Sequence, residues 1–136
     1  MTDEFRMANQ ESRTPWVSVG AVGAALAVIA GAFGAHALAG RLDARSLTLW
    51  ETAARYLMYG SLGLMLLGLA RIARPQKLQR AAGLVLALGT GVFSGTVFAL
   101  ALGGPRILGA VTPLGGLGMI AGFLLFALGA RAGSIP

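Results

Sequence analysis

The sequence contains no cysteine, a single histidine and few charged residues. The absence of cysteine excludes disulfide bonds, iron–sulfur clusters and thiol chemistry within this chain. Charged residues make up 12% of the 136 residues, about half the share of a typical soluble protein, whereas 56% are hydrophobic. So few charges cannot cover the surface of a soluble domain, and the composition therefore predicts an integral membrane protein.

The few charges are also segregated along the chain. Four long runs lack Asp, Glu, Lys and Arg: residues 14–40, 56–70, 81–105 and 107–130. Because about 20 apolar residues cross a bilayer as a helix, these runs predict an all-α, four-helix transmembrane bundle. We place the spans at about residues 16–37, 53–71, 81–102 and 108–130. They form one membrane domain over residues 16–131, between a polar, flexible cytoplasmic tail (1–15) and a short tail (132–136).

A short amphipathic segment is predicted between the first two spans, at the outer interface. Thr48 and Glu51 fit a capping box at the start of a helix that continues into the second span. Glu51 and Arg55 are four residues apart in the order that favours an ion pair. The aromatic residues expected to anchor the chain at the membrane interfaces are Trp16, Trp50, Tyr56 and Tyr59.

The basic residues predict the topology. With four spans, seven of them lie on one side: Arg6, Arg13, Arg71, Arg74, Lys77, Arg80 and Arg131. Four lie on the other side: Arg41, Arg45, Arg55 and Arg106. The positive-inside rule then places both termini in the cytoplasm of a bacterium, with the protein in its inner membrane. The net charge of +6 is explained by topology and lipid head groups, so no nucleic-acid partner is expected.

Glycine is abundant, with 21 residues, most of them inside the spans. Two GxxxG spacings lie inside the spans, one in the third and one in the fourth, and small residues let helices approach closely in lipid. The candidate helix-packing residues are Gly31, Gly91, Gly95, Gly118 and Gly122. They serve either packing within one bundle or association with another copy or subunit. In the first case, the apolar surface left for partners is Leu62, Leu66, Leu69, Phe123 and Phe126.

Few residues could carry chemistry. His36 ends the first span, and we expect it to lie near Glu51 and Arg55 in an interfacial polar cluster, in contact with Glu51 directly or through water; a pH-sensing role is the alternative. One histidine without cysteine or clustered carboxylates predicts no metal site and no cofactor. No acid lies inside a span, which argues against ion-coupled transport and against an acid–base enzyme.

Four motifs occur in an order typical of one family of small membrane proteins. They are Gly31-Ala-Phe-Gly-Ala-His-Ala-Leu38, Trp50-Glu51-Thr52-Ala53 with Tyr56 and Tyr59, Phe93-Ser94-Gly95-Thr96, and Thr112-Pro113-Leu114-Gly115-Gly116. Over about residues 16–130, the chain resembles the DUF423 family, which is related to eukaryotic transmembrane protein 256. The resemblance implies four helices and no particular reaction. Where the family usually reads Tyr-Gln-Met-Tyr-His, this chain has Tyr56-Leu57-Met58-Tyr59-Gly60, so any polar cluster built on two histidines in relatives is incomplete here.

Two functions are compatible with these observations. The first is a non-enzymatic accessory, structural or assembly component of a larger membrane complex, bound to lipid and to partner helices. The second is a small transporter or channel for an uncharged or lipophilic solute. A pore needs a continuous polar lining. The available residues are Ser61, Thr90, Ser94, Thr96 and Thr112.

Overall fold

The computed structural model describes residues 3–4, 15–70 and 76–132. Within these ranges the long elements are four helices, and there is no strand. The helices are α2 (Trp16–His36), α3 (Ala44–Leu69), α4 (Gln76–Ala101) and α5 (Leu108–Ala132). The all-α class is as the sequence predicts. Most of the tails predicted at 1–15 and 132–136 lie outside the described residues.

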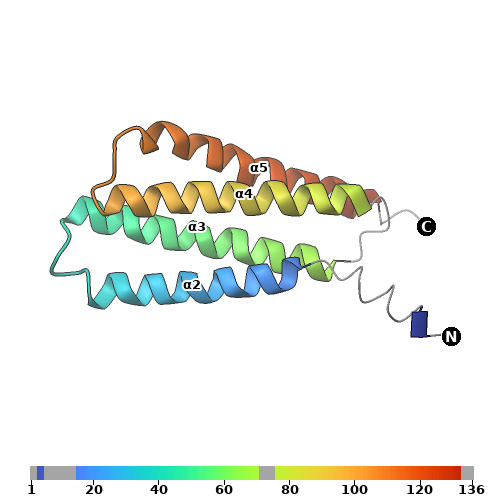
Figure 1. Cartoon of the computed structure of the whole chain (residues 1–136), viewed down its shortest axis with the longest axis horizontal. Coiled ribbons are helices and arrows are strands. Elements are labelled where there is room, and N and C mark those ends of the chain that lie inside the picture. Colours follow the sequence, from blue (N-terminus) through green and yellow to red (C-terminus); the bar gives the residue numbers. More distant parts are fainter. Residues whose placement is uncertain (1–2, 5–14, 71–75, 133–136) are drawn as a thin grey trace.

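The four helices lie side by side in chain order, each antiparallel to the next (Figure 1). α2 packs on α3, α3 on α4 and α4 on α5, while a smaller contact joins α3 to α5. Among the described residues, α2 and α5 share no contact of comparable extent. The arrangement is therefore a row with α2 and α5 at its two edges, rather than a ring in which the first and last helices meet.

The start of α3 differs from the prediction. The helix begins at Ala44, and its N-cap is Asp43, whose carboxylate accepts a hydrogen bond from the backbone N–H of Ser46 (2.7 Å). The hydroxyl of Thr48 instead donates to the carbonyl of Ala44 inside the helix (2.9 Å), so the predicted capping box is wrong. Asp is at least as good an N-cap as Thr, and it comes first along the chain. The amphipathic segment is thus the first part of α3 itself.

The turn between α4 and α5 is as tight as its glycines predict. Gly103 has a positive φ of 88°, a conformation that glycine adopts without strain. Its N–H donates to Leu100 (3.1 Å), and the N–H of Gly104 donates to Ala99 (2.8 Å). This pair of bonds is a Schellman motif, which satisfies the last carbonyls of α4 and reverses the chain.

Three of the four helices are long and apolar enough to cross a membrane, over residues 16–36, 77–101 and 108–130. α3 is not among them. It carries Arg45, Glu51 and Arg55 in its first half. Its 26 residues nevertheless extend for about 39 Å between α2 and α4. Large apolar side chains cover the outer surfaces of the row, for example Val22, Ile29 and Leu124, each about 60% exposed. Such surfaces suit contact with lipid.

The buried core is small and is shared by all four helices. Its members are Trp16, Leu64, Leu67, Ala82, Leu86 and Met119. Elsewhere glycines bring the helices close: between α4 and α5 the backbones themselves come into contact, and at other sites a glycine receives a side chain of the neighbouring helix, such as Trp50 at Gly34.

Candidate functional site

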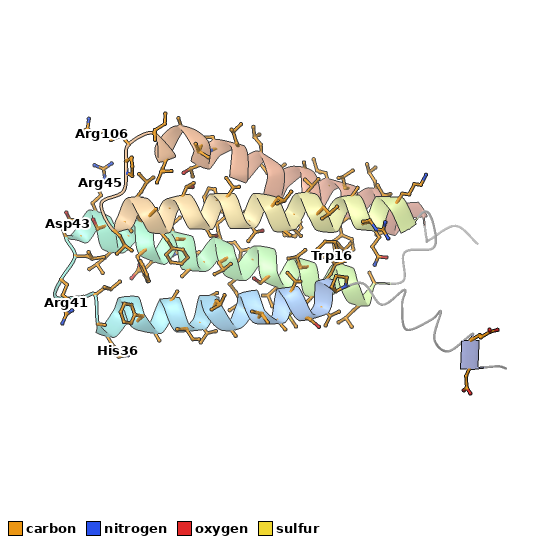
Figure 2. The ribbon with its side chains drawn as sticks, viewed as in Figure 1. Trp16, His36, Arg41, Asp43, Arg45 and Arg106 are labelled. Atoms are coloured by element: carbon orange, nitrogen blue, oxygen red, sulfur yellow. The ribbon has the colours of Figure 1, made fainter. Side chains whose placement is uncertain are left out.

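The three residues of the predicted polar cluster are all exposed and do not come together. His36 is the last residue of α2, and Figure 2 shows it at the edge of the row, pointing away from α3. No hydrogen bond or ion pair joins His36, Glu51 or Arg55 to one another in the described part of the chain. The neighbouring Trp50 faces α2, and one residue further round the helix Glu51 is turned away from it. The expected direct contact is therefore not present, and a contact through water stays a prediction.

Trp50 connects three helices rather than anchoring the chain at an interface. Its indole N–H donates to the carbonyl of Ala30 in α2 (2.7 Å). Its ring packs edge-on against Phe98 of α4 (centroids 4.7 Å apart) and lies 6.2 Å from Phe33. The ring fits at Gly34, where an added Cβ would lie 2.6 Å from an indole carbon. Trp50 thus fixes the register of α2 and α4 against α3.

Trp16 is also in the interior, although the sequence predicts an interfacial anchor. Only 7% of its surface is exposed. The indole lies against Gly83 of α4, and its Cβ is close to Gly68 of α3. Both contact residues lack a side chain, so there is room for the large ring at the end of the row. The indole nitrogen is buried and has no hydrogen-bond partner in the described structure.

The two tyrosines are exposed on α3, beside α4. Tyr56 packs on Phe93 of α4 (4.7 Å) and on Tyr59 (5.4 Å), and 38% and 50% of the two tyrosines are exposed. Phe93 is eight residues from the end of α4 at Ala101, which corresponds to about 12 Å along the helix. The interfacial role of Tyr56 and Tyr59 stays a prediction.

The closest helix contact joins α4 and α5 through glycine. A Cβ on Gly118 would lie 3.0 Å from the Cα of Gly89, and one on Gly122 would lie 2.7 Å from the Cα of Leu86. A Cβ on Gly115 would overlap the backbone of Phe93. Gly89 and Gly115 are not among the candidates predicted from the sequence, because neither has a second glycine four positions away. The sequence signal for these two glycines is their distance from the turn at Gly103. Because α4 and α5 run antiparallel from this turn, residues at similar distances on either side of it lie opposite each other.

Three of the predicted packing glycines have a different environment. A Cβ on Gly31, Gly91 or Gly95 would meet nothing within 4 Å. Gly91 and Gly95 are exposed on α4, on the side away from α3 and α5, with Leu88 (67% exposed) and Val92 (38%) beside them. The prediction that they pack inside the monomer is wrong: α4 uses Gly89 and Leu86 for those contacts, which leaves its GxxxG face open.

The hydroxyl groups fall into two separate sets. The hydroxyls of Thr96 of α4 and Thr112 of α5 share a hydrogen bond (2.7 Å), in which either can be the donor. The carbonyls of Val92 (2.7 Å from the Thr96 hydroxyl) and Leu108 (2.8 Å from the Thr112 hydroxyl) are also within reach, and the hydroxyl that accepts the shared bond donates its own proton to the carbonyl in its own helix. The other set consists of Ser61, Thr90 and Ser94, which are 2–4% exposed. Thr90 and Ser94 are buried on α4, and Ser61 is a residue of α3 that faces α2.

The second set has an unusual environment. The hydroxyls of Thr90 and Ser94 have no hydrogen-bond partner in the described structure. Thr90 fills the space that a Cβ on Gly60 would need, and Ser61 fills the corresponding space at Gly23. We call such a space, left by the missing side chain of a glycine, a notch. A hydroxyl oxygen in a notch faces the Cα–H groups of the glycine, which are weak hydrogen-bond donors. The two sets join helices to each other and do not form one polar line.

Few charged groups lie at the end of the row where α2 connects to α3 and α4 connects to α5. Arg41, Arg45 and Arg106 are exposed there, together with Asp43 (Figure 2). The hydrogen bond from the Ser46 N–H, with a smaller contribution from Arg45, lowers the pKa of Asp43 below its usual value of 3.8. Among the described residues no group of three or more His, Cys, Asp or Glu side chains could hold a metal ion.

Comparison with known proteins supports a membrane family. The family model described as "Protein of unknown function (DUF423)" matches residues 30–116. The chain is 43% identical over 110 residues to the UPF0382 membrane protein SH2409 of Staphylococcus haemolyticus, covering 81% of this chain and 89% of the relative. It is 37% identical over 116 residues to the UPF0382 membrane protein YwdK of Bacillus subtilis, covering 85% and 94%. No solved structure matches the chain. The chain is thus a membrane protein that belongs to the DUF423 family.

Proposed function

We propose that this protein is a non-enzymatic accessory or structural component of a larger membrane complex, and that it binds a partner helix through the exposed face of α4. We define this α4 face by Gly91 and Gly95 with the flanking Leu88 and Val92. The observation that carries the proposal is the open space at both glycines, where an added Cβ would meet nothing within 4 Å.

The α4 face has the form of a helix-association surface. In lipid there is no hydrophobic force between helices, so close backbone approach and side-chain packing drive association. Gly91 and Gly95 form a groove one turn apart, and the exposed Leu88 and Val92 form a ridge beside it. The groove is not used within the monomer, because the α4–α5 contact runs through Gly89. Binding of a partner helix is therefore the most direct explanation for the groove at Gly91 and Gly95.

The distribution of polar groups favours this function over transport of an uncharged solute. A pore requires polar groups along one path. Here Thr96 and Thr112 are consumed by bonds between α4 and α5, whereas Thr90 and Ser94 are buried on the α3 side of α4. The absence of catalysis is part of the proposal, since the exposed His36 and Glu51 share no contact in the described structure.

For topology, we propose four spans in a bacterial inner membrane with both termini cytoplasmic. The start of α2 and the end of α5 lie at the same end of the row (Figure 1), and α3 has the length to cross with its neighbours. Reporter fusions after Lys77 and after Arg131 should read cytoplasmic, and a fusion at Ala44 should read external. A cytoplasmic signal at Ala44 would contradict the four-span topology.

The function is tested by one substitution made on two surfaces. Gly95→Leu fills the α4 face, whereas Gly31→Leu, which also meets nothing within 4 Å, places the same side chain on α2. Both variants should fold, with wild-type yield and size in mild detergent. We expect proteins that copurify with the wild type and with Gly31→Leu to fall by about tenfold with Gly95→Leu. Equal recovery with both variants, or no partner with the wild type, would refute the proposal.

A further inference from the structure

The outward side of α3 carries a continuous stripe of exposed residues. They follow one another at alternating intervals of four and three: Thr48, Thr52, Arg55, Tyr59, Leu62, Leu66 and Leu69. Thr52 is half-buried and the others are exposed, with Leu66 at 60% and Leu69 at 69%. This spacing repeats every seven residues, which is the pattern that keeps one side of a helix against a parallel partner helix. We call it the α3 stripe, and Glu51 flanks it.

The charged part of the α3 stripe lies below the ends of the neighbouring helices. Ser61 packs against Gly23 of α2, and Arg55 precedes Ser61 by six residues, which puts Arg55 at about the level of Ile29. Ile29 is seven residues from the end of α2, so the depth is about 10 Å. The contact of Tyr56 with Phe93 gives a similar depth from α4. Glu51 is one turn shallower.

These two charges have no ionic partner among the residues that the structure describes. Glu51 and Arg55 are exposed and four residues apart, yet no ion pair joins them in the described structure. A charge at membrane depth is costly, by about 2.5–3.5 kcal/mol for Arg at the bilayer centre on the insertion scale and less nearer the interface. Pairing with an opposite charge in a water-poor contact removes part of this penalty. The α3 stripe therefore favours a partner surface that itself carries an acid and a base one turn apart.

We propose that the occupant of the α3 stripe is the α3 stripe of a second copy of this chain. Two copies inserted with the same topology present α3 in parallel, related by a two-fold axis along the membrane normal. Glu51 of each copy then faces Arg55 of the other, so the contact contains two ion pairs and each of the four charges has one partner. Deeper in the membrane, Leu62, Leu66 and Leu69 of the two copies interdigitate. The stripe is complementary to itself in charge and in shape, which is the requirement for a two-fold contact.

This contact leaves the α4 face free. The α3 stripe points away from the α3–α4 contact, and Gly91 and Gly95 also point away from it, on the other helix. The two surfaces therefore lie on different sides of the row. Self-association through α3 and binding of a partner through α4 are thus independent, and each can fail without the other.

The absence of cysteine makes the contact directly testable by cross-linking. Leu66→Cys places a thiol on the α3 stripe, and Val22→Cys places one on α2 at similar exposure (60% and 61%). In membranes under mild oxidation, Leu66→Cys should form disulfide-linked dimers and Val22→Cys should form about tenfold fewer. Equal cross-linking of the two variants, or no dimer with Leu66→Cys, would overturn the proposal.

Charge reversal tests the pairing itself. In the Leu66→Cys background, a Glu51→Arg chain carries two positive charges on this surface and an Arg55→Glu chain carries two negative ones. Each alone should lose about tenfold in cross-linking, because like charges meet, and coexpression should restore it as a mixed dimer. If each variant loses cross-linking and coexpression does not restore it, the proposed pairing of Glu51 with Arg55 is wrong. Gly95→Leu should leave cross-linking unchanged, which separates this result from that for the α4 face.

Discussion

The glycine contact between α4 and α5 makes a quantitative prediction with a matched control. Gly122→Ala adds one methyl group whose carbon would lie 2.7 Å from Cα of Leu86. Ordinary carbon contacts are about 3.5–4.0 Å, so the two helices must separate by about 1 Å or bend. Overpacking of this kind costs about 1–3 kcal/mol. Gly95→Ala adds the same methyl to open space on α4.

Both substitutions gain the same intrinsic helix propensity, at most about 1 kcal/mol. The difference between the two variants therefore isolates the steric term, and we expect Gly122→Ala to be about 1–3 kcal/mol less stable than Gly95→Ala. Gly95→Ala should match or exceed the wild type. Unfolding by a harsh detergent added to mild micelles, followed by tryptophan fluorescence, gives both values, because Trp16 and Trp50 lie in helix contacts. Equal stability of the two variants would show that α4 and α5 do not approach at Gly122.

Two further predictions concern single hydrogen bonds. Trp50→Phe keeps an aromatic ring against Phe98 and removes the bond to Ala30, so it should lower the free energy of unfolding by about 0.5–1.5 kcal/mol, whereas Tyr59→Phe on the outer surface should leave it nearly unchanged. Asp43→Ala should destabilise the start of α3 at neutral pH. Because the Ser46 N–H lowers the pKa of Asp43, the advantage of the wild type is complete above pH 3.8 and declines as the pH falls below it through the folded-state pKa. A helix-content difference between wild type and Asp43→Ala that persists undiminished in acid would contradict this.

The main features of the fold follow from the sequence because charge and length are local properties. The charge-free runs predict α2, α4 and α5 to within a few residues, and Gly103 predicts the turn between the last two helices. The start of α3 was misplaced because Asp43 and Thr48 are both good N-caps, and only the backbone shows that Asp43 is used.

The roles of individual glycines and aromatic residues were harder to predict. Gly89 and Gly91 are two residues apart on α4, yet one touches α5 and the other faces outward. Two residues rotate a helix surface by about 200°, so the assignment depends on which face meets the neighbour. In lipid both faces are apolar, and hydrophobicity does not distinguish them. Trp16 illustrates the same limit, since the space for its ring is created by Gly83, sixty-seven positions away in the chain.

The row order of the helices has a consequence for how the protein is made. Every extensive contact joins helices that are consecutive in the chain, so α2 with α3 and α4 with α5 form two helical hairpins joined by the α3–α4 contact. Each hairpin can enter the membrane and close as soon as its second helix leaves the ribosome, without waiting for the C-terminus. The gene is therefore divisible between Leu69 and Gln76, and the two hairpins, synthesised as separate polypeptides, carry between them the Gly60–Thr90 notch and the Trp50–Phe98 contact needed to find each other in the bilayer.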